Sequence, residues 1–156
     1  DKEHQAKVAK TYIGCEVHPD WHCFQTFAKD YVEMATGKAD WHLEKDIMIR
    51  GNRLYSKDTC TMLPAEINSL LSSSAAKRGD FPIGVTYYKP TSKYKASIGI
   101  GETAIHLGYF GTVDGAFAVY KQAKESHIKR QANKWRSQID PRAYEALMNY
   151  EVLITD

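Results

Sequence analysis

The stretch that decides the fold is "GVTYYKPTSKYKASIGIGETAIHLGYFGT", which runs from Gly84 to Thr112. Apolar residues alternate in it with small or charged residues, and the alternation breaks only at "KPTSK" and "GIGET". Because successive side chains of a strand point to opposite faces, the alternation predicts half-buried strands, and the two breaks predict the turns between them. We therefore expect a three-stranded antiparallel sheet.

The segment after this stretch, "VDGAFAVYKQAKESHIKRQANKW", predicts a long helix. Thr112 is a suitable cap for it, and Asp114 suits its first turn. An apolar stripe at helical spacing is formed by Ala116, Val119, Tyr120 and Ala123. We expect this stripe to pack on one face of the sheet, which carries Val85, Tyr87, Tyr94, Ala96, Ile98, Ile105 and Leu107.

The opposite face of the sheet combines lysines with small and hydrogen-bonding side chains. Its predicted members are Thr86, Tyr88, Lys93, Lys95, Ser97, Gly99, Ala104 and His106. A β-ribbon fits the major groove of DNA, which is about 12 Å wide, and lysines bind phosphates. This face therefore predicts binding to double-stranded DNA.

The charge of the chain is distributed unevenly along the sequence. The net charge is only +2, but residues 77–136 hold eleven Lys or Arg and four Asp or Glu, which gives +7. A basic region inside a nearly neutral chain is typical of proteins that bind polyanions such as nucleic acid.

The composition limits the class of protein. The chain has 156 residues, of which 43% are hydrophobic and 26% charged, as in soluble globular proteins. No apolar run approaches the roughly 18 residues of a membrane span, so no membrane partner is expected. Three cysteines without a C-x-x-C pair favour a reducing, intracellular compartment. The chain begins at Asp1 without Met or a signal peptide, and we expect residues to be missing upstream.

The residues before the sheet predict a separate unit in the order helix, strand, strand, helix. "DWHCFQTFAKDYVEMATGK" predicts an amphipathic helix whose aromatic stripe faces the core. Two β-prone runs flank Gly51 and Asn52, a pair typical of hairpin turns, and Pro64 suits the start of a short helix. Small, polar and turn-forming residues then indicate a linker. The expected domains are a first unit over 1–76, a linker over 77–82 and a second unit over 83–156, with a short helix from Pro141.

The second unit contains "GVTYYKPTSKYKASI" and "IHLGYFGTVDGAFAVY", which resemble the plant apetala/ethylene-response-factor DNA-binding domain over about sixty residues. The resemblance implies DNA contacts at Thr86, Tyr88, Lys93, Lys95, Ser97, Gly99 and His106. The plant domains carry several arginines and tryptophans on that face. Arginine is the preferred bidentate reader of guanine, so the resemblance does not extend to their sequence preference.

The first unit carries a series of short motifs, which are Leu43-Glu44-Lys45-Asp46-Ile47, Gly51-Asn52, Tyr55-Ser56, Thr59-Cys60 and Ile67-Asn68. These motifs are similar to those of the ββα-metal unit of His-Asn-His nucleases, as joined to an apetala-type domain in bacteriophage homing endonucleases. The similarity also includes the C-terminal "YEALMNYEVLITD". The similarity implies an α+β protein in the host cytoplasm, associated with the nucleoid: a degenerate HNH-like ββα unit, then a three-stranded antiparallel sheet packed on a long helix.

Lys45 occupies the position of the general-base histidine in active nucleases of this kind. An ordinary lysine, with a pKa of about 10.4, is protonated at neutral pH and cannot take a proton from water. We therefore expect a DNA-binding protein that does not cleave. In this interpretation the phosphate contacts of the first unit are Lys45, Arg50, Arg53 and Lys57.

Three alternatives remain open. The first is an active, magnesium-dependent endonuclease that would use His42, Asp46 and Asn68. The second is a zinc site, which would draw its ligands from Cys15, His18, His22, Cys23 and Cys60. The third is a protein-interaction factor that targets a host or defence protein, and its partner would be a host or phage protein.

Overall fold

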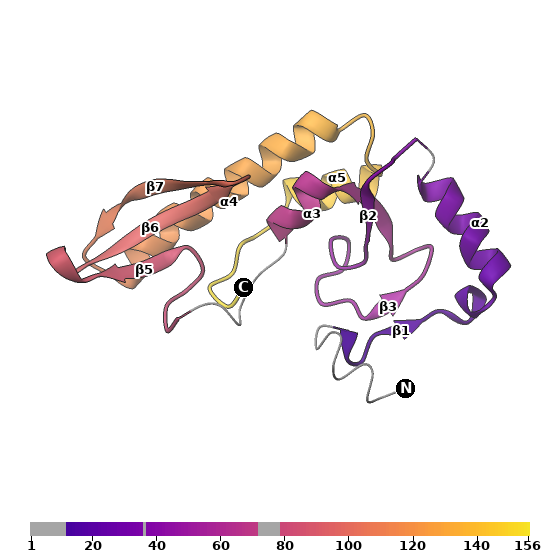
Figure 1. Ribbon diagram of the computed structural model, residues 1–156, viewed down its shortest axis with the longest axis horizontal. Helices are drawn as coiled ribbons and strands as arrows, with labels where there is room; N and C mark the ends of the chain where they lie inside the picture. Colours follow the sequence, from indigo (N-terminus) through magenta and orange to yellow (C-terminus); the bar gives the residue numbers. More distant parts are fainter. Residues whose placement is uncertain (1–11, 36, 72–78) are drawn as a thin grey trace. The chain divides into compact units, whose positions relative to one another are not determined.

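The computed structural model describes residues 12–35, 37–71 and 79–156. These residues form both helices and strands, which confirms the predicted α+β class. Figure 1 shows the order of the elements along the chain.

The chain divides into two compact units. The first contains the described residues up to Ala65 together with Ile139–Ala143, and the second contains Glu66–Gln138 and Tyr144–Asp156. The division lies at the start of a short helix, earlier in the chain than the expected linker over 77–82. Residues 77 and 78 of that linker lie outside the described residues.

The second unit is built on a three-stranded antiparallel sheet in the order β5-β6-β7. The strands are β5 (Val85–Tyr88), β6 (Lys93–Ile100) and β7 (Thr103–Phe110), and the short 3-10 helix η4 (Lys89–Thr91) connects the first two. The long helix α4 (Val113–Trp135) packs on the sheet (Figure 1). It begins where the sequence predicts, because the Thr112 hydroxyl accepts a hydrogen bond from the Gly115 amide at 3.1 Å.

The core of the second unit lies between this sheet and α4. Its buried members are Val85, Ala96, Ile98, Ala116, Phe117, Tyr120 and Val152. Val152 comes from the C-terminal tail, which Lys121 and Glu125 of α4 hold in place. The Lys121 ammonium donates to the Val152 carbonyl at 2.8 Å, and the Val152 amide donates to Glu125 at 2.9 Å.

Gly84 directly precedes β5 and lets the backbone pass close to Tyr120 of α4. A Cβ atom at this position would lie 2.0 Å from the Tyr120 ring, and the Gly84 φ angle is +77°. Any other residue would be strained and would also displace a buried aromatic ring.

A β-bulge in β7 changes which side chains reach each face of the sheet. Ala96 pairs with Gly108 while Ser97 pairs with His106, so Leu107 is an extra residue in β7. Gly108 has a φ angle of +141°, which glycine adopts readily. We call the face away from α4 the outer face and the opposite one the helix face.

The strands of the first unit pair in a different way from the prediction. Its elements are β1 (Glu16–Val17), η2 (Pro19–His22), α2 (Phe24–Ala35), β2 (Trp41–Glu44), β3 (Leu54–Tyr55) and β4 (Thr61–Pro64). β2 pairs antiparallel with β4, and β1 pairs parallel with β3. The predicted hairpin between the runs that flank Gly51 and Asn52 is therefore wrong, because β2 and β3 have other partners.

Helix α3 (Ala65–Leu71) follows β4, and α5 (Pro141–Met148) lies near the C-terminus. Both begin close to the predicted residues. Asp140 accepts a hydrogen bond from the Arg142 amide at 2.8 Å, as expected of a helix cap.

The aromatic stripe of α2 and the turn before it is only partly buried. Trp21 is buried and meets the Phe27 ring edge-on at 5.2 Å between centroids. Phe24, which was expected in the core, is 72% exposed. The buried residue of this helix is instead Asp30, which binds the Trp21 indole, and Phe27 and Met34 are half-buried.

Candidate nucleic-acid interface

The outer face brings the predicted DNA contacts of the second unit together. Directly paired residues of neighbouring strands lie on the same face, and the pairs Thr86–Lys95 and Tyr88–Lys93 join β5 to β6. Ser97–His106 and Gly99–Ala104 continue this face into β7. The outer face therefore consists of Thr86, Tyr88, Lys93, Lys95, Ser97, Gly99, Ala104, His106 and one further residue of β7, Tyr109.

The helix face is less completely covered than the alternation predicts. Tyr87 and Ile105 were expected in the core, but each is 43% exposed. Tyr87 packs on Tyr94 and Phe81, with ring centroids 5.4 Å and 6.5 Å away. The buried part of this face therefore centres on Val85, Ala96 and Ile98.

Tyr109 is a member of the outer face that sequence reasoning missed. Strict alternation from Ile105 and Leu107 would place Tyr109 on the helix face. The bulge reverses the order, so Tyr109 pairs with Lys95 on the outer face and Phe110 pairs with Tyr94 on the helix face. The signal in the sequence was Gly108, because a glycine inside a strand often marks a bulge.

The outer face carries positive charge without acidic residues. Lys93 and Lys95 belong to it, and Lys89 lies in the adjoining η4. None of the three forms an ion pair with any of the residues that the structure describes. Their ammonium groups are therefore available to anionic groups of a partner.

Three of the five Lys and Arg residues of α4 are paired or partly buried, whereas Lys129 and Arg130 are exposed. Lys121 pairs with Glu125 and Glu151, each at 3.0 Å. Lys134 pairs with Glu66 at 2.8 Å. Burial lowers the pKa of Lys124, and burial together with the nearby Arg130 and Lys124 lowers the pKa of His127. Helix α4 therefore offers less positive charge to a ligand than its number of Lys and Arg residues suggests.

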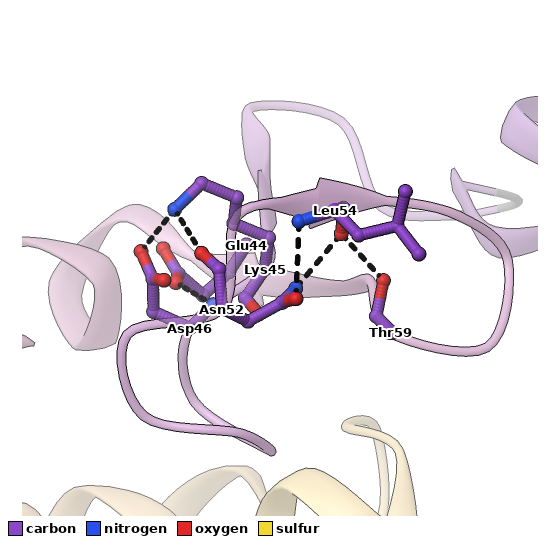
Figure 2. A network of polar contacts seen from close by, with 6 residues as sticks. All are labelled: Glu44, Lys45, Asp46, Asn52, Leu54 and Thr59. Carbon is purple, nitrogen blue, oxygen red and sulfur yellow. Dashed lines mark hydrogen bonds and ion pairs between the residues drawn. The ribbon is translucent and has the colours of Figure 1, made fainter. Parts of the chain in front are cut away.

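Lys45, the predicted phosphate contact of the first unit, belongs to a polar network inside that unit (Figure 2). Its side chain is only 13% exposed. The ammonium group binds the Asp46 carboxylate at 2.6 Å and the Asn52 carbonyl at 3.0 Å. It also lies 5.7 Å from the centre of the Tyr55 ring. These contacts give Lys45 a structural role and leave little of it for a phosphate.

Asn52 closes the same loop from the other end, as Figure 2 shows. Its side-chain amide donates to the Lys45 carbonyl at 3.0 Å and to the Leu54 carbonyl at 2.8 Å. Its side-chain oxygen accepts from the Leu54 amide at 3.0 Å. The Thr59 hydroxyl also donates to the Leu54 carbonyl, at 2.7 Å. The residues that predicted a hairpin turn therefore fix a loop between β2 and β3.

The other basic residues predicted to contact DNA from the first unit lie at its surface. Arg50 and Arg53 are exposed, and the Arg53 guanidinium lies against Gly14. Lys57 bridges Asp30 at 3.0 Å and Glu33 at 2.9 Å. The hydrogen bond to Glu33, and next that to Asp30, raises the pKa of Lys57.

The residues predicted to act in catalysis lie in β2, in the loop after it and in α3. His42 is an exposed residue of β2 opposite Leu63, and Asp46 binds Lys45 in the loop. Asn68 lies in α3 and belongs to the second unit. Within residues 12–35, 37–71 and 79–156, no three His, Cys, Asp or Glu side chains are grouped so that they could hold a metal ion.

The absence of such a group among the described residues also bears on the predicted zinc site. Cys60 is buried, Cys15 is half-buried and Cys23 is exposed. His18 caps η2 by accepting a hydrogen bond from the Asp20 amide at 3.3 Å, and His22 is exposed. Burial raises the pKa of the Cys60 thiol, which is the behaviour of a cysteine packed as an apolar residue.

Comparisons with protein-family models, curated proteins and solved structures found no match to this chain. No helix within the described residues is long and apolar enough to cross a membrane.

Proposed function

We propose that the protein binds double-stranded DNA through the outer face of β5, β6 and β7. The observation that carries the proposal is the pair Lys93 and Lys95 on an exposed sheet face whose nine residues include no acidic side chain. Lysines without acidic partners bind phosphates, and Thr86 and Ser97 beside them can donate hydrogen bonds. A sheet of this width can enter the major groove.

The proposal assigns the first unit a non-cleaving role, as a degenerate relative of the ββα nucleases. Two observations support it. Lys45 stands where the general base is expected and is held by Asp46 and Asn52. Along the chain, the paired strands β2 and β4, with β3 between them, precede α3, which resembles the element order of a ββα unit, and α3 from Glu66 onward belongs to the second unit. An active magnesium-dependent endonuclease is the alternative that the test must exclude.

The test measures the affinity for duplex DNA of the double variant Lys93→Glu, Lys95→Glu by fluorescence anisotropy at moderate salt. Affinity is expected to fall more than about tenfold, because two phosphate contacts become repulsive. The matched control is Lys29→Glu, Lys129→Glu, which makes the same change of net charge at exposed residues of α2 and α4.

The control variant is expected to bind close to normally. Equal losses in both variants would mean that only net charge matters, and an unchanged affinity in the sheet variant would refute the proposed face. Incubation of the natural protein with magnesium and duplex DNA, followed by sequencing of new ends, tests for cleavage. New ends at one site would establish the endonuclease instead.

A further inference from the structure

We propose that Tyr109, together with Tyr88 and His106, contacts thymine-containing base pairs and sets the sequence preference, while Lys93 and Lys95 contact the phosphates. This inference rests on the DNA-binding face proposed above and divides its residues into two roles. We call Tyr88, Tyr109 and His106 the aromatic strip.

The aromatic strip crosses the centre of the outer face. The Tyr88 ring lies 5.1 Å from the Tyr109 ring, and the His106 ring lies 4.6 Å from the Tyr109 ring, between centroids. Tyr88 belongs to β5 and the other two belong to β7, so the tyrosine rings meet over the central strand β6. The strip therefore occupies the part of the face that would lie deepest in a groove.

The bulge in β7 makes this strip possible. If Leu107 were paired regularly and the strand had no bulge, strict alternation would place Tyr109 on the helix face and Phe110 on the outer face. The bulge thus leaves the apolar Phe110 beside the core and sends a ring with a hydroxyl group to the exposed side. Each ring of the strip is supported by another ring, so little side-chain freedom remains to be lost on binding.

The chemistry of the strip suits base edges better than phosphates. Tyrosine rings are uncharged and largely apolar, and apolar groups discriminate thymine by contact with its 5-methyl group in the major groove. The tyrosine hydroxyls and the imidazole nitrogens can exchange hydrogen bonds with neighbouring base edges. The outer face contains no arginine, the side chain best suited to bidentate contact with guanine.

The lysines supply a different part of the binding. A lysine ammonium is a point charge on a flexible chain, and each phosphate that it neutralises releases counterions. Removing one such lysine is expected to weaken binding on all sequences alike and to reduce the salt dependence by about one unit of slope. Removing a ring is expected to change the preferred sequence and leave that slope unchanged.

The experiment selects bound fragments from randomised duplex DNA with the natural protein and with three variants. Tyr109→Ala removes the ring, and Lys95→Gln removes a charge. Tyr87→Ala is the matched control, because Tyr87 is also 43% exposed but lies on the helix face. Circular dichroism and thermal unfolding verify that each variant is folded.

The natural protein is expected to select a motif with thymine at one or more positions. Tyr109→Ala should lose the preference at those positions, while Lys95→Gln and Tyr87→Ala should keep the motif. Replacing one selected thymine by uracil, which lacks only the methyl group, should weaken binding by the natural protein about fourfold. The same replacement should have no effect on Tyr109→Ala.

The outcomes separate the two proposals. If the natural protein does not bind duplex DNA, the proposed function itself fails. If it binds but Tyr109→Ala selects the same motif with the same response to uracil, only the role of the strip is refuted. Tighter binding to a single strand than to the duplex would also overturn the inference, because the rings would then stack on unpaired bases.

Discussion

Asp30 shows how one buried carboxylate organises the first unit. It accepts hydrogen bonds from the Trp21 indole at 2.9 Å and from the Lys57 ammonium at 3.0 Å. The hydrogen bond from Trp21, and next that from Lys57, lowers the pKa of Asp30. Nothing in the helical periodicity indicated this, because periodicity identifies apolar faces and Asp30 lies on the polar side of α2.

Asp30→Asn is therefore expected to destabilise the first unit at neutral pH, since the buried Trp21 indole and the Lys57 ammonium lose a charged acceptor. The folded-state pKa of Asp30 lies below its unfolded value of about 3.9, so its contribution is complete above that pH and is lost as the pH falls through the folded pKa. Urea unfolding at pH 7 and at successively lower pH measures both effects.

The control for this prediction is Asp20→Asn, because the Asp20 side chain is 74% exposed. That variant should unfold close to the natural protein at every pH. If Asp30→Asn is as stable as the natural protein at pH 7, the hydrogen bonds of Asp30 do not stabilise the unit in the way described.

The elements differ in how far the sequence could predict them. Helix α4 covers the predicted segment, because its cap at Thr112 and its apolar stripe are local signals. The faces of β5 and β6 follow the alternation for the same reason. Alternation predicts the wrong face for Tyr109, because it does not allow for the extra residue Leu107 in β7.

The pairing of β2 with β4 could not be predicted from local sequence signals. Gly51 and Asn52 are a good turn pair, but Asn52 uses its side chain to bind Lys45 and Leu54, which holds an open loop. The choice of partner strand depends on long-range packing, which a short run of β-prone residues does not specify. Most of the zinc residues were grouped by closeness in sequence and the catalytic residues by a family resemblance, and the structure places both sets on different elements.

Removing the N-cap of α4 tests how much this cap contributes to the stability of the helix that packs on the sheet. Thr112→Ala is expected to lower the free energy of unfolding by about 1 kcal/mol, because the Gly115 amide loses its acceptor. Denaturant unfolding gives the difference, and Thr103→Ala, at an exposed residue of β7, is the comparison. A loss no larger than that of the comparison would mean that the cap contributes nothing.

At the scale of the whole molecule, pairing and burial reduce the charge asymmetry that the sequence indicates. Lys121 and Lys134 are ion-paired, and Lys124 is half-buried. Lys129 and Arg130 of α4 stay exposed, and the lysines of the sheet lie on a face without acidic residues. The two units therefore differ in character: the first is rich in internal polar networks, and the second offers an exposed cationic and aromatic sheet face.

The most direct measurement is a titration of the ¹⁵N-labelled protein with a short DNA duplex, followed by amide chemical shifts. Binding by the proposed face predicts the largest shifts in β5, β6 and β7, at Thr86, Lys95, Ser97 and Tyr109, which fade as salt is raised. Absence of shifts, or shifts confined to the first unit, would contradict DNA binding through this sheet.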